Sequence, residues 1–120
     1  MRVLVYGGRD FTKQNLGFRA LDQLHAEFGF TLVIDGMARG ADTIGYNWAQ
    51  KEELPSERYP AQWDKYGRSA GPIRNKQMLD EGKPDIAVAF PGGTGTSNMT
   101  KQLLEAGVLV KFVIPKGKTR

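Results

Sequence analysis

The sequence predicts an α/β protein with a Rossmann-like, doubly wound parallel sheet of about five strands and helices on both faces. Three observations support this prediction. Short apolar runs recur along the chain, helical patterns alternate with them, and glycine-rich loops follow several of the runs. Continuous apolar strands are typical of parallel sheets covered on both faces, and right-handed crossovers then give the doubly wound arrangement.

Two strand–helix units are predicted in the first part of the chain. The apolar run at 2–6, which ends at a pair of glycines, predicts the first strand. A helix follows, because apolar residues then repeat every four positions, with Thr12 as a suitable N-cap and Gly29 as a suitable stop. The run at 31–34 predicts the second strand, and Asp42 is interpreted as the N-cap of the second helix.

The middle of the chain is predicted to be less regular. A weak third strand is expected at 56–59, between two breaks that contain proline. The segment 61–72 is expected to be a long irregular connection. Because Pro72 suits the first turn of a helix, a third helix is predicted over 72–81.

The last part of the chain contains the best candidate for a central strand, the apolar run at 85–90. The motif PGGTGTSN (91–98) follows it, then a fourth helix that ends at Gly107 and a fifth strand at 108–114. With a sheet order of 3-2-1-4-5, ligands would bind beyond the carboxyl ends of the first and fourth strands. The glycine-rich loops at 7–11 and 91–98 leave these two strands and would meet over one cleft.

Composition restricts the classes of function. A length of 120 residues suits one domain, predicted at 1–115 with a basic tail at 116–120. The absence of cysteine excludes disulfides, thiolate metal ligands and a cysteine nucleophile. With one histidine and no cluster of carboxylates, we expect no metal and no other cofactor. The net charge of +4 favours an anionic ligand.

Location and assembly are also predicted. The chain starts with MRVLVYGG, whose apolar run is too short for a secretion signal or a membrane span. We therefore expect a cytoplasmic protein without a membrane partner. A sheet domain of this size with apolar and aromatic residues to spare is expected to form a homo-oligomer, a dimer or larger.

The motif at 91–98 has the composition of a phosphate-binding loop. Its glycines let the backbone approach a ligand, and Thr96 and Ser97 lie where a helix N-terminus exposes free N–H groups that attract an anion. It is not a Walker A motif, because no G-K-[ST] follows, and no dinucleotide fingerprint follows the first strand. The alternative interpretation is a glycine-rich turn in which threonine or serine caps a helix.

Two arginines near the same cleft have alternative interpretations. Arg9 can bind a phosphate through its forked guanidinium, or it can be a surface residue that pairs with Asp10 or Asp35. Arg39 is either a second phosphate ligand or the partner of Asp42. Asp42 itself is interpreted as a helix cap rather than a catalytic residue.

The segment 61–78 is the most unusual, because aromatic residues and arginines alternate there with glycine and proline. It suits a wall that stacks on a base and binds phosphate, with Arg74 and Asn75 in the first turn of the third helix. Alternatively, Trp63 belongs to the core and Arg68 to the solvated surface. The candidate ligand-binding residues lie in this segment and in the loops at 7–11, 35–42 and 91–98: Gly7, Gly8, Arg9, Gly36, Arg39, Gly40, Asp42, Arg68, Arg74, Asn75, Pro91, Gly92, Gly93, Thr94, Gly95, Thr96 and Ser97.

Four motifs together resemble a known family. GGRDF, DGMARGAD, AQWDKYGRSAGPIRNKQM and AFPGGTGTSNM occur in this order in small prokaryotic and phage proteins of the SLOG superfamily, and the chain looks most like its YspA/YpsA-related branch. The resemblance covers the chain from Val3 to about Gly107. It implies a Rossmann-like fold and a nucleotide or nucleotide-derived ligand. The superfamily includes LOG phosphoribohydrolases, DNA-processing DprA proteins and antiphage sensor domains that bind ADP-ribose-derived signals.

The chain departs from the LOG enzymes at one position with a catalytic role. Those enzymes carry P-G-G-x-G-T-x-x-E, and Met99 stands here in place of the glutamate. Their Arg-Lys pair is matched only by Arg74, because Asn75 stands where the lysine would be. Cleavage of an N-glycosidic bond needs a nearby carboxylate, so the resemblance implies binding more firmly than catalysis. The matching positions of the motif are Pro91, Gly92, Gly93, Gly95 and Thr96.

Three functions are left open by the sequence. The first is a module that binds a nucleoside phosphate or an ADP-ribose-like ligand as a sensor, carrier or sequestering protein. The second is a LOG-type N-glycosidic nucleotide hydrolase in which another carboxylate, from Asp10, Asp35, Asp42 or Asp64, replaces the missing glutamate. The third is single-stranded DNA binding of the DprA kind. No lysine–arginine stripe on a predicted helix supports the third function, so nucleic acid is not the expected partner.

Overall fold

The computed structural model describes residues 1–115, so the basic tail predicted at 116–120 lies outside the described residues. A five-stranded sheet in the order β3-β2-β1-β4-β5 forms the centre of the structure, and all its neighbouring strands are parallel. The predicted Rossmann-like fold class and the predicted sheet order are therefore both confirmed. The strands are β1 (Arg2–Tyr6), β2 (Leu32–Asp35), β3 (Ser56–Arg58), β4 (Ile86–Ala89) and β5 (Leu109–Phe112).

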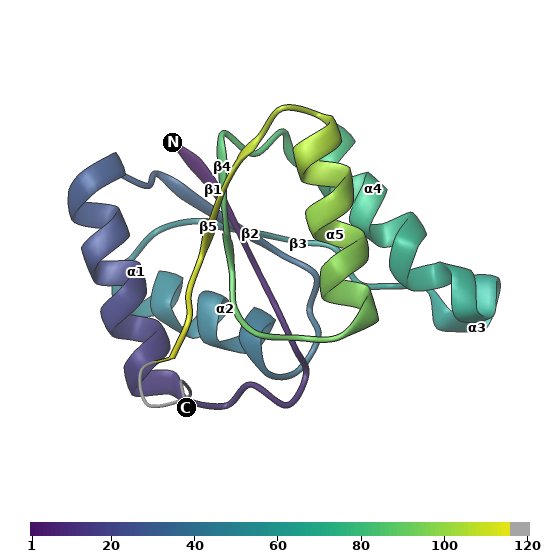
Figure 1. The fold of residues 1–120 in the computed structure, drawn as a ribbon, viewed down its shortest axis with the longest axis horizontal. Coiled ribbons are helices and arrows are strands. Elements are labelled where there is room, and N and C mark those ends of the chain that lie inside the picture. The colour runs from purple at the N-terminus through teal and green to yellow at the C-terminus, as the bar shows by residue number, and fades with distance from the viewer. Residues whose placement is uncertain (116–120) are drawn as a thin grey trace.

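Helices cover both faces of the sheet, as predicted (Figure 1). On one face, α1 (Gln14–Phe28) and α2 (Ala41–Lys51) pack over a core that includes Val5 and Val88. On the other face, α4 (Ala70–Gly82) and α5 (Thr94–Glu105) pack over a core that includes Leu4 and Ala87. Adjacent residues of β1 and β4 thus face opposite cores, which explains why both strands are continuously apolar.

Trp48 of α2 anchors the first of these cores. Its side chain is fully buried, and its indole N–H donates a hydrogen bond of 2.9 Å to Oδ1 of Asp22 on α1. Ile44 of the same helix is also buried in this core. Truncating a buried tryptophan to alanine costs about 3–5 kcal/mol, so this contact between α1 and α2 contributes substantially to stability.

Two predicted helix starts are wrong. The carbonyl of Thr12 accepts a hydrogen bond of 2.9 Å from the N–H of Gln14, and α1 begins only at Gln14, after Lys13 as N-cap. The N-cap of α2 is Gly40, so Asp42 lies within the first turn instead of capping it. The predicted stop is confirmed, because Gly29 follows α1 in the left-handed conformation with φ of 72°.

The segment predicted as irregular is mostly helical. A short helix, α3 (Trp63–Tyr66), and a 3₁₀ turn, η1 (Gly67–Ser69), lead directly into α4, which starts at Ala70. In the same way, α5 starts at Thr94, inside the glycine-rich motif and not after it. Local helix propensity is a weak signal that tertiary packing overrides, and both segments pack against neighbouring helices.

Candidate functional site

Three loops meet at the carboxyl edge of the sheet. The loop after β1 contacts the loop after β4, because the N–H of Gly8 donates a hydrogen bond of 2.8 Å to the carbonyl of Pro91. It also contacts the start of α2, because the carbonyl of Gly8 accepts a hydrogen bond of 3.1 Å from the N–H of Ala41. The meeting of the two glycine-rich loops that the sequence predicts is therefore observed.

Two glycines are required for this close approach. Gly40 has a φ of 78°, and a Cβ there would lie 2.3 Å from the carbonyl oxygen of Gly8. A Cβ on Gly92 would lie 2.0 Å from Oγ1 of Thr96. No side chain fits at either position, so these glycines fix the packing of the loops.

A polar cavity of about 610 Å³, called the cleft below, opens above the junction of β1 and β4. Its lining combines the loop after β1, the starts of α2, α4 and α5, and Trp63 of α3. Three arginines and one aspartate line it, so its wall carries a positive charge. Most of the predicted ligand-binding residues line the cleft: Gly7, Gly8, Arg9, Asp42, Arg68, Arg74, Asn75, Gly93, Thr94, Gly95 and Thr96.

The other predicted residues lie elsewhere. Gly36 and Arg39 line a side hollow of about 380 Å³ that shares Arg9 and Arg74 with the cleft. Gly40 lies beneath Gly8 and lines neither. Three more line a separate groove between α5 and β5, called the α5–β5 groove: Pro91, Gly92 and Ser97.

The N-terminus of α5 opens into the cleft. Gly93 is its N-cap and supplies no side-chain hydrogen bond, and the first helical hydrogen bond runs from the N–H of Ser97 to the carbonyl of Gly93 at 3.0 Å. The N–H groups before Ser97 therefore lack helical acceptors. A Cβ on Gly93 or Gly95 would meet nothing within 4 Å, so the backbone is open to a ligand.

The ion pairs differ from the predicted alternatives. Arg9 forms no ion pair within residues 1–115, and Asp35 pairs instead with Arg58, whose Nε lies 3.1 Å from Oδ1. Arg39 pairs with Asp10 at 3.4 Å, on the exposed surface, and not with Asp42. The structural alternatives for Arg9 and for Arg39 are thus wrong in the partners they named.

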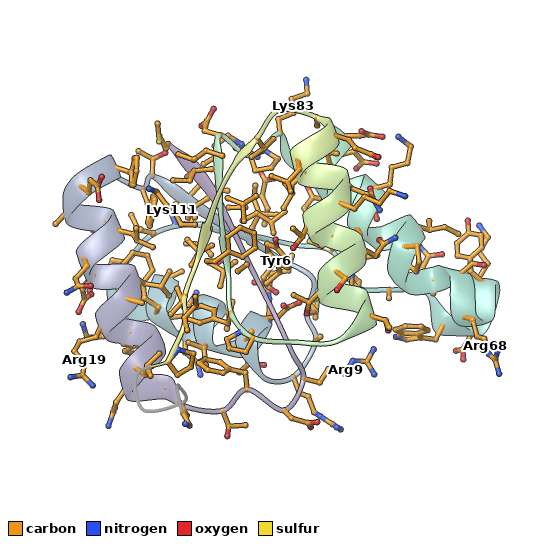
Figure 2. The ribbon with its side chains drawn as sticks, in the orientation of Figure 1. Tyr6, Arg9, Arg19, Arg68, Lys83 and Lys111 are labelled. Carbon is orange, nitrogen blue, oxygen red and sulfur yellow. The ribbon has the colours of Figure 1, made fainter. Side chains whose placement is uncertain are left out.

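Arg9 lies over Trp63 at one side of the cleft. The guanidinium carbon is 5.2 Å from the centre of the indole ring, and Trp63 is 46% exposed. The interpretation of Trp63 as a core residue is therefore wrong. Arg9 and Arg68 both extend toward the α3 end of the molecule (Figure 2).

Asp42 and Arg74 hold the loop after β2 from two sides. Oδ2 of Asp42 accepts hydrogen bonds from the N–H groups of Gly36, at 2.9 Å, and Ala38, at 3.3 Å. Nη1 of Arg74 donates to the carbonyl of Gly36. Asp42 thus caps the β2–α2 loop and not the helix, which explains why its carboxyl is buried.

Burial shifts the ionisation of this pair. It raises the pKa of Asp42 from 3.8 to about 6, and the nearby carboxyl of Asp35 adds to this increase. The N–H donors of the loop and the charge of Arg74 oppose it. Burial also lowers the pKa of Arg74, and the carboxyl of Asp42 counteracts that shift. Asp42 therefore titrates closer to neutrality than an ordinary aspartate.

Asn75 positions the wall of the cleft. Its amide nitrogen donates to Oδ1 of Asn98 at 3.1 Å and to the carbonyl of Gly95 at 3.4 Å, and its side-chain oxygen accepts from Nε of Arg74 at 3.0 Å. Asn75 is only 5% exposed. It thus joins Arg74 to the first turn of α5.

Several lining residues are absent from the predicted set: Tyr6, Ala38, Trp63, Gly71, Pro72, Met78, Asn98 and Met99. Asn98 and Met99 belong to α5, which the sequence predicts to start only after residue 98 and which in fact starts at Thr94. Met99 is 1% exposed, and it lies at the position where the LOG pattern has its glutamate. An apolar side chain thus occupies that position in the cleft.

Among residues 1–115, no three histidine, aspartate or glutamate side chains gather into a group that could hold a metal ion. In the same part of the chain, no helix combines the length and the apolar character needed to cross a membrane.

The parallel sheet, its strand order and the cleft beyond the first and fourth strands define a Rossmann-like α/β protein. The model of the YspA, cpYpsA-related SLOG family matches residues 1–66. "Gene 61 protein" of Mycobacterium phage D29 is 35% identical over 117 residues, which cover 91% of this chain and 93% of that protein. The chain belongs to the YspA, cpYpsA-related SLOG family. No solved structure matches it significantly.

Proposed function

We propose that the cleft binds a nucleotide or nucleotide-derived ligand, such as a nucleoside phosphate or an ADP-ribose-like molecule. The protein would then act as a sensor, a carrier or a sequestering protein. One observation carries this proposal: Arg9, Arg74 and the open N-terminus of α5 line the same cavity. Helix N-termini and arginines are both recurrent binding groups for phosphate. Membership of the SLOG family is consistent with a nucleotide-related ligand.

In this proposal each part of the ligand has its own binding group. The phosphate accepts hydrogen bonds from the N–H groups at 94–96, and Arg9 and Arg74 balance its charge. The exposed indole of Trp63 offers a surface on which a base can stack. Asp42 also lines the cleft, and its Oδ1 can accept a hydrogen bond from a ribose hydroxyl, since the loop N–H groups bind Oδ2.

The test is a ligand panel with two readouts. The purified protein is heated with nucleosides, the matching nucleoside monophosphates, NAD and ADP-ribose, and each mixture is then analysed by mass spectrometry. We expect phosphorylated members to raise the melting temperature, the matching nucleosides to raise it little, and the ligand to be recovered unchanged. Equal stabilisation by nucleoside and nucleotide, or by none of the panel, would contradict the proposal.

A second candidate function is hydrolysis of the N-glycosidic bond of a nucleoside monophosphate. It is favoured by the carboxyl of Asp42, which lines the cleft and has a pKa of about 6. A carboxylate with this pKa accepts a proton from water near neutral pH. Water would then add to C1′ of the ribose as the bond from C1′ to the base breaks, and the base would leave with a proton.

The Asp42→Asn variant separates the two candidates. If the protein is a hydrolase, wild type releases free base and ribose phosphate, whereas the variant still binds the nucleotide but does not release base. If the protein only binds, neither form releases base. Release of base at equal rates by both forms would exclude Asp42 as the catalytic carboxylate.

A further inference from the structure

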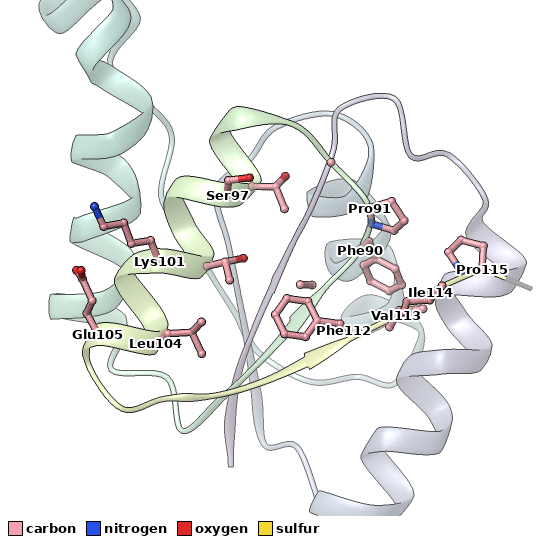
Figure 3. Close-up of a pocket in the computed structure, with 14 residues that line it drawn as sticks. Phe90, Pro91, Ser97, Lys101, Leu104, Glu105, Phe112, Val113, Ile114 and Pro115 are labelled. Atoms are coloured by element: carbon pink, nitrogen blue, oxygen red, sulfur yellow. The ribbon is translucent and has the colours of Figure 1, made fainter. Parts of the chain in front are cut away.

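The α5–β5 groove lies outside the cleft and has a different character. Its volume is about 740 Å³, and its walls are mainly apolar (Figure 3). Leu104 on α5 is 56% exposed, and Phe112 and Ile114 on the opposite side are 58% and 77% exposed. Apolar side chains that gather with such exposure commonly mark an interaction surface.

The groove runs along an edge of the sheet. β5 has a neighbour on one side only, β4, so its outer edge has no strand beside it. Open sheet edges are usually covered or protected in folded proteins. Within residues 1–115 neither the edge of β5 nor the apolar wall is covered by another element.

Two opposite charges lie at the rim of the groove. Lys101 and Glu105 lie on α5 with Leu104 and are among the residues that line the groove, but their charged ends point away from Phe112, whereas Leu104 points toward it (Figure 3). They stand four residues apart, a spacing at which side chains on a helix can pair. Nevertheless, neither residue forms an ion pair within residues 1–115. Both charges are therefore free to pair with another molecule.

We propose that a second copy of this chain covers the α5–β5 groove in a symmetric dimer, with α5 antiparallel to α5 of the partner subunit. In a two-fold interface, a contact between one residue and another is repeated with the roles exchanged. If the axis passes midway between Lys101 and Glu105, Lys101 meets the partner's Glu105 and Glu105 meets the partner's Lys101. One arrangement thus pairs all four charges.

The same axis buries the apolar wall. Because a helix rises 1.5 Å per residue, Leu104 and the partner's Leu104 would be offset by only about 3 Å along the helices. Each α5 would then lie beside the apolar side chains that extend from the other chain's β5 edge. The opposite signs at a spacing of four residues suit a second copy in particular, because the pattern is its own complement when reversed.

The test uses charge reversal and measures mass in solution by sedimentation velocity or light scattering. Wild type is expected at twice the chain mass of 13.3 kDa. Lys101→Glu and Glu105→Lys each place two like-charge pairs at the interface, so we expect each to weaken the dimer by about tenfold or more. The double variant restores both pairs and should regain the wild-type dimer. Arg19→Glu, on the exposed face of α1, is the control and should stay dimeric.

Mixing gives a stricter test of the two-fold arrangement. A Lys101→Glu chain and a Glu105→Lys chain, each a weaker dimer than wild type alone, should together form a heterodimer held by two salt bridges. Circular dichroism of each variant confirms that it is folded, which we expect because both side chains are exposed. A monomeric wild type would overturn the proposal. So would single variants that dimerise as tightly as wild type, or a double variant and a mixture that fail to recover the wild-type affinity.

Discussion

Asp42 and Arg74 both bind the backbone of Gly36, one at its N–H and the other at its carbonyl. The N–H of Gly36 donates to Oδ2 of Asp42 at 2.9 Å, while the carbonyl of Gly36 accepts from Nη1 of Arg74. The two side chains have opposite charge, and both line the cleft. The cleft wall is therefore assembled before any ligand arrives, which lowers the conformational cost of binding.

The first prediction concerns pH. Folding raises the pKa of Asp42 from 3.8 to about 6, so the folded protein binds a proton more tightly than the unfolded chain. This group therefore lowers stability as pH rises from about 4 through 6, by an amount on the order of 3 kcal/mol in total. We expect Asp42→Asn to lack this loss. Urea unfolding of both proteins at several pH values between 4 and 8 measures it.

The comparison of the two proteins removes the effect of other groups. Most other titrating groups are common to both, so the difference in their free energies of unfolding mainly reports Asp42. Relative to wild type, Asp42→Asn should gain stability as pH rises from 4 to 7. A difference that stays constant over this range would show that burial does not raise the pKa of Asp42.

The second prediction separates two arginines of the cleft. Arg74 is half-buried beside Asp42, whereas Arg68 is exposed. Arg74→Ala should weaken the binding of a nucleoside monophosphate by about 1.5–3 kcal/mol, the range for a hydrogen bond to a charged group. Because the charge of Arg68 is solvated, Arg68→Ala should weaken the binding of the same nucleotide by less than about 1 kcal/mol. Calorimetric titration of both variants with nucleotide and nucleoside is the measurement. Equal losses for the two ligands in Arg74→Ala would show that Arg74 does not contact the phosphate.

The central strands β1, β2 and β4 are predictable because burial on both faces leaves a continuous apolar run. β4, at Ile86–Ala89, falls inside the run at 85–90, and the glycines around it mark where the chain turns. The helix starts are less predictable, because they depend on which backbone carbonyls accept the first hydrogen bonds. At Thr12 the carbonyl closes a short turn instead, which no side-chain pattern reveals.

The location of the cleft is predictable for a similar reason. Once the strand order is inferred, the loops after β1 and β4 must meet, and the hydrogen bond from Gly8 to Pro91 is the result. The charge partners cannot be inferred in this way. Asp35 is taken by Arg58 from the neighbouring edge strand, and only the register of β2 and β3 places these two residues side by side.

The third prediction uses the two tryptophans as reporters. Trp48 is fully buried, whereas Trp63 is exposed in the cleft. A base that stacks on Trp63 should quench the fluorescence of wild type but not of Trp63→Ala, and the substitution should cost about 1–3 kcal/mol of binding. Ribose 5-phosphate has no base, so its affinity should not change. If quenching persists in the variant, the base does not stack on Trp63.

The fourth prediction is that one substitution at Gly95 raises stability and lowers nucleotide binding. This residue lies in the first turn of α5, and a Cβ there would meet nothing within 4 Å. Replacing it with aspartate removes a glycine from a helix and puts a negative charge at its N-terminus. Together these effects should stabilise the free protein by about 0.5–1 kcal/mol. The same carboxylate occupies the place proposed for the phosphate and repels it.

Gly95→Asn is the matched control for the fourth prediction, because it has the same shape without the charge. We expect Gly95→Asp to melt above wild type and to lose nucleotide binding, while Gly95→Asn keeps a large part of that binding. Thermal unfolding with and without nucleotide measures both properties on one sample. Nucleotide binding that survives in Gly95→Asp would remove the N-terminus of α5 from the phosphate site, because a like charge at that distance cannot be accommodated without loss of affinity.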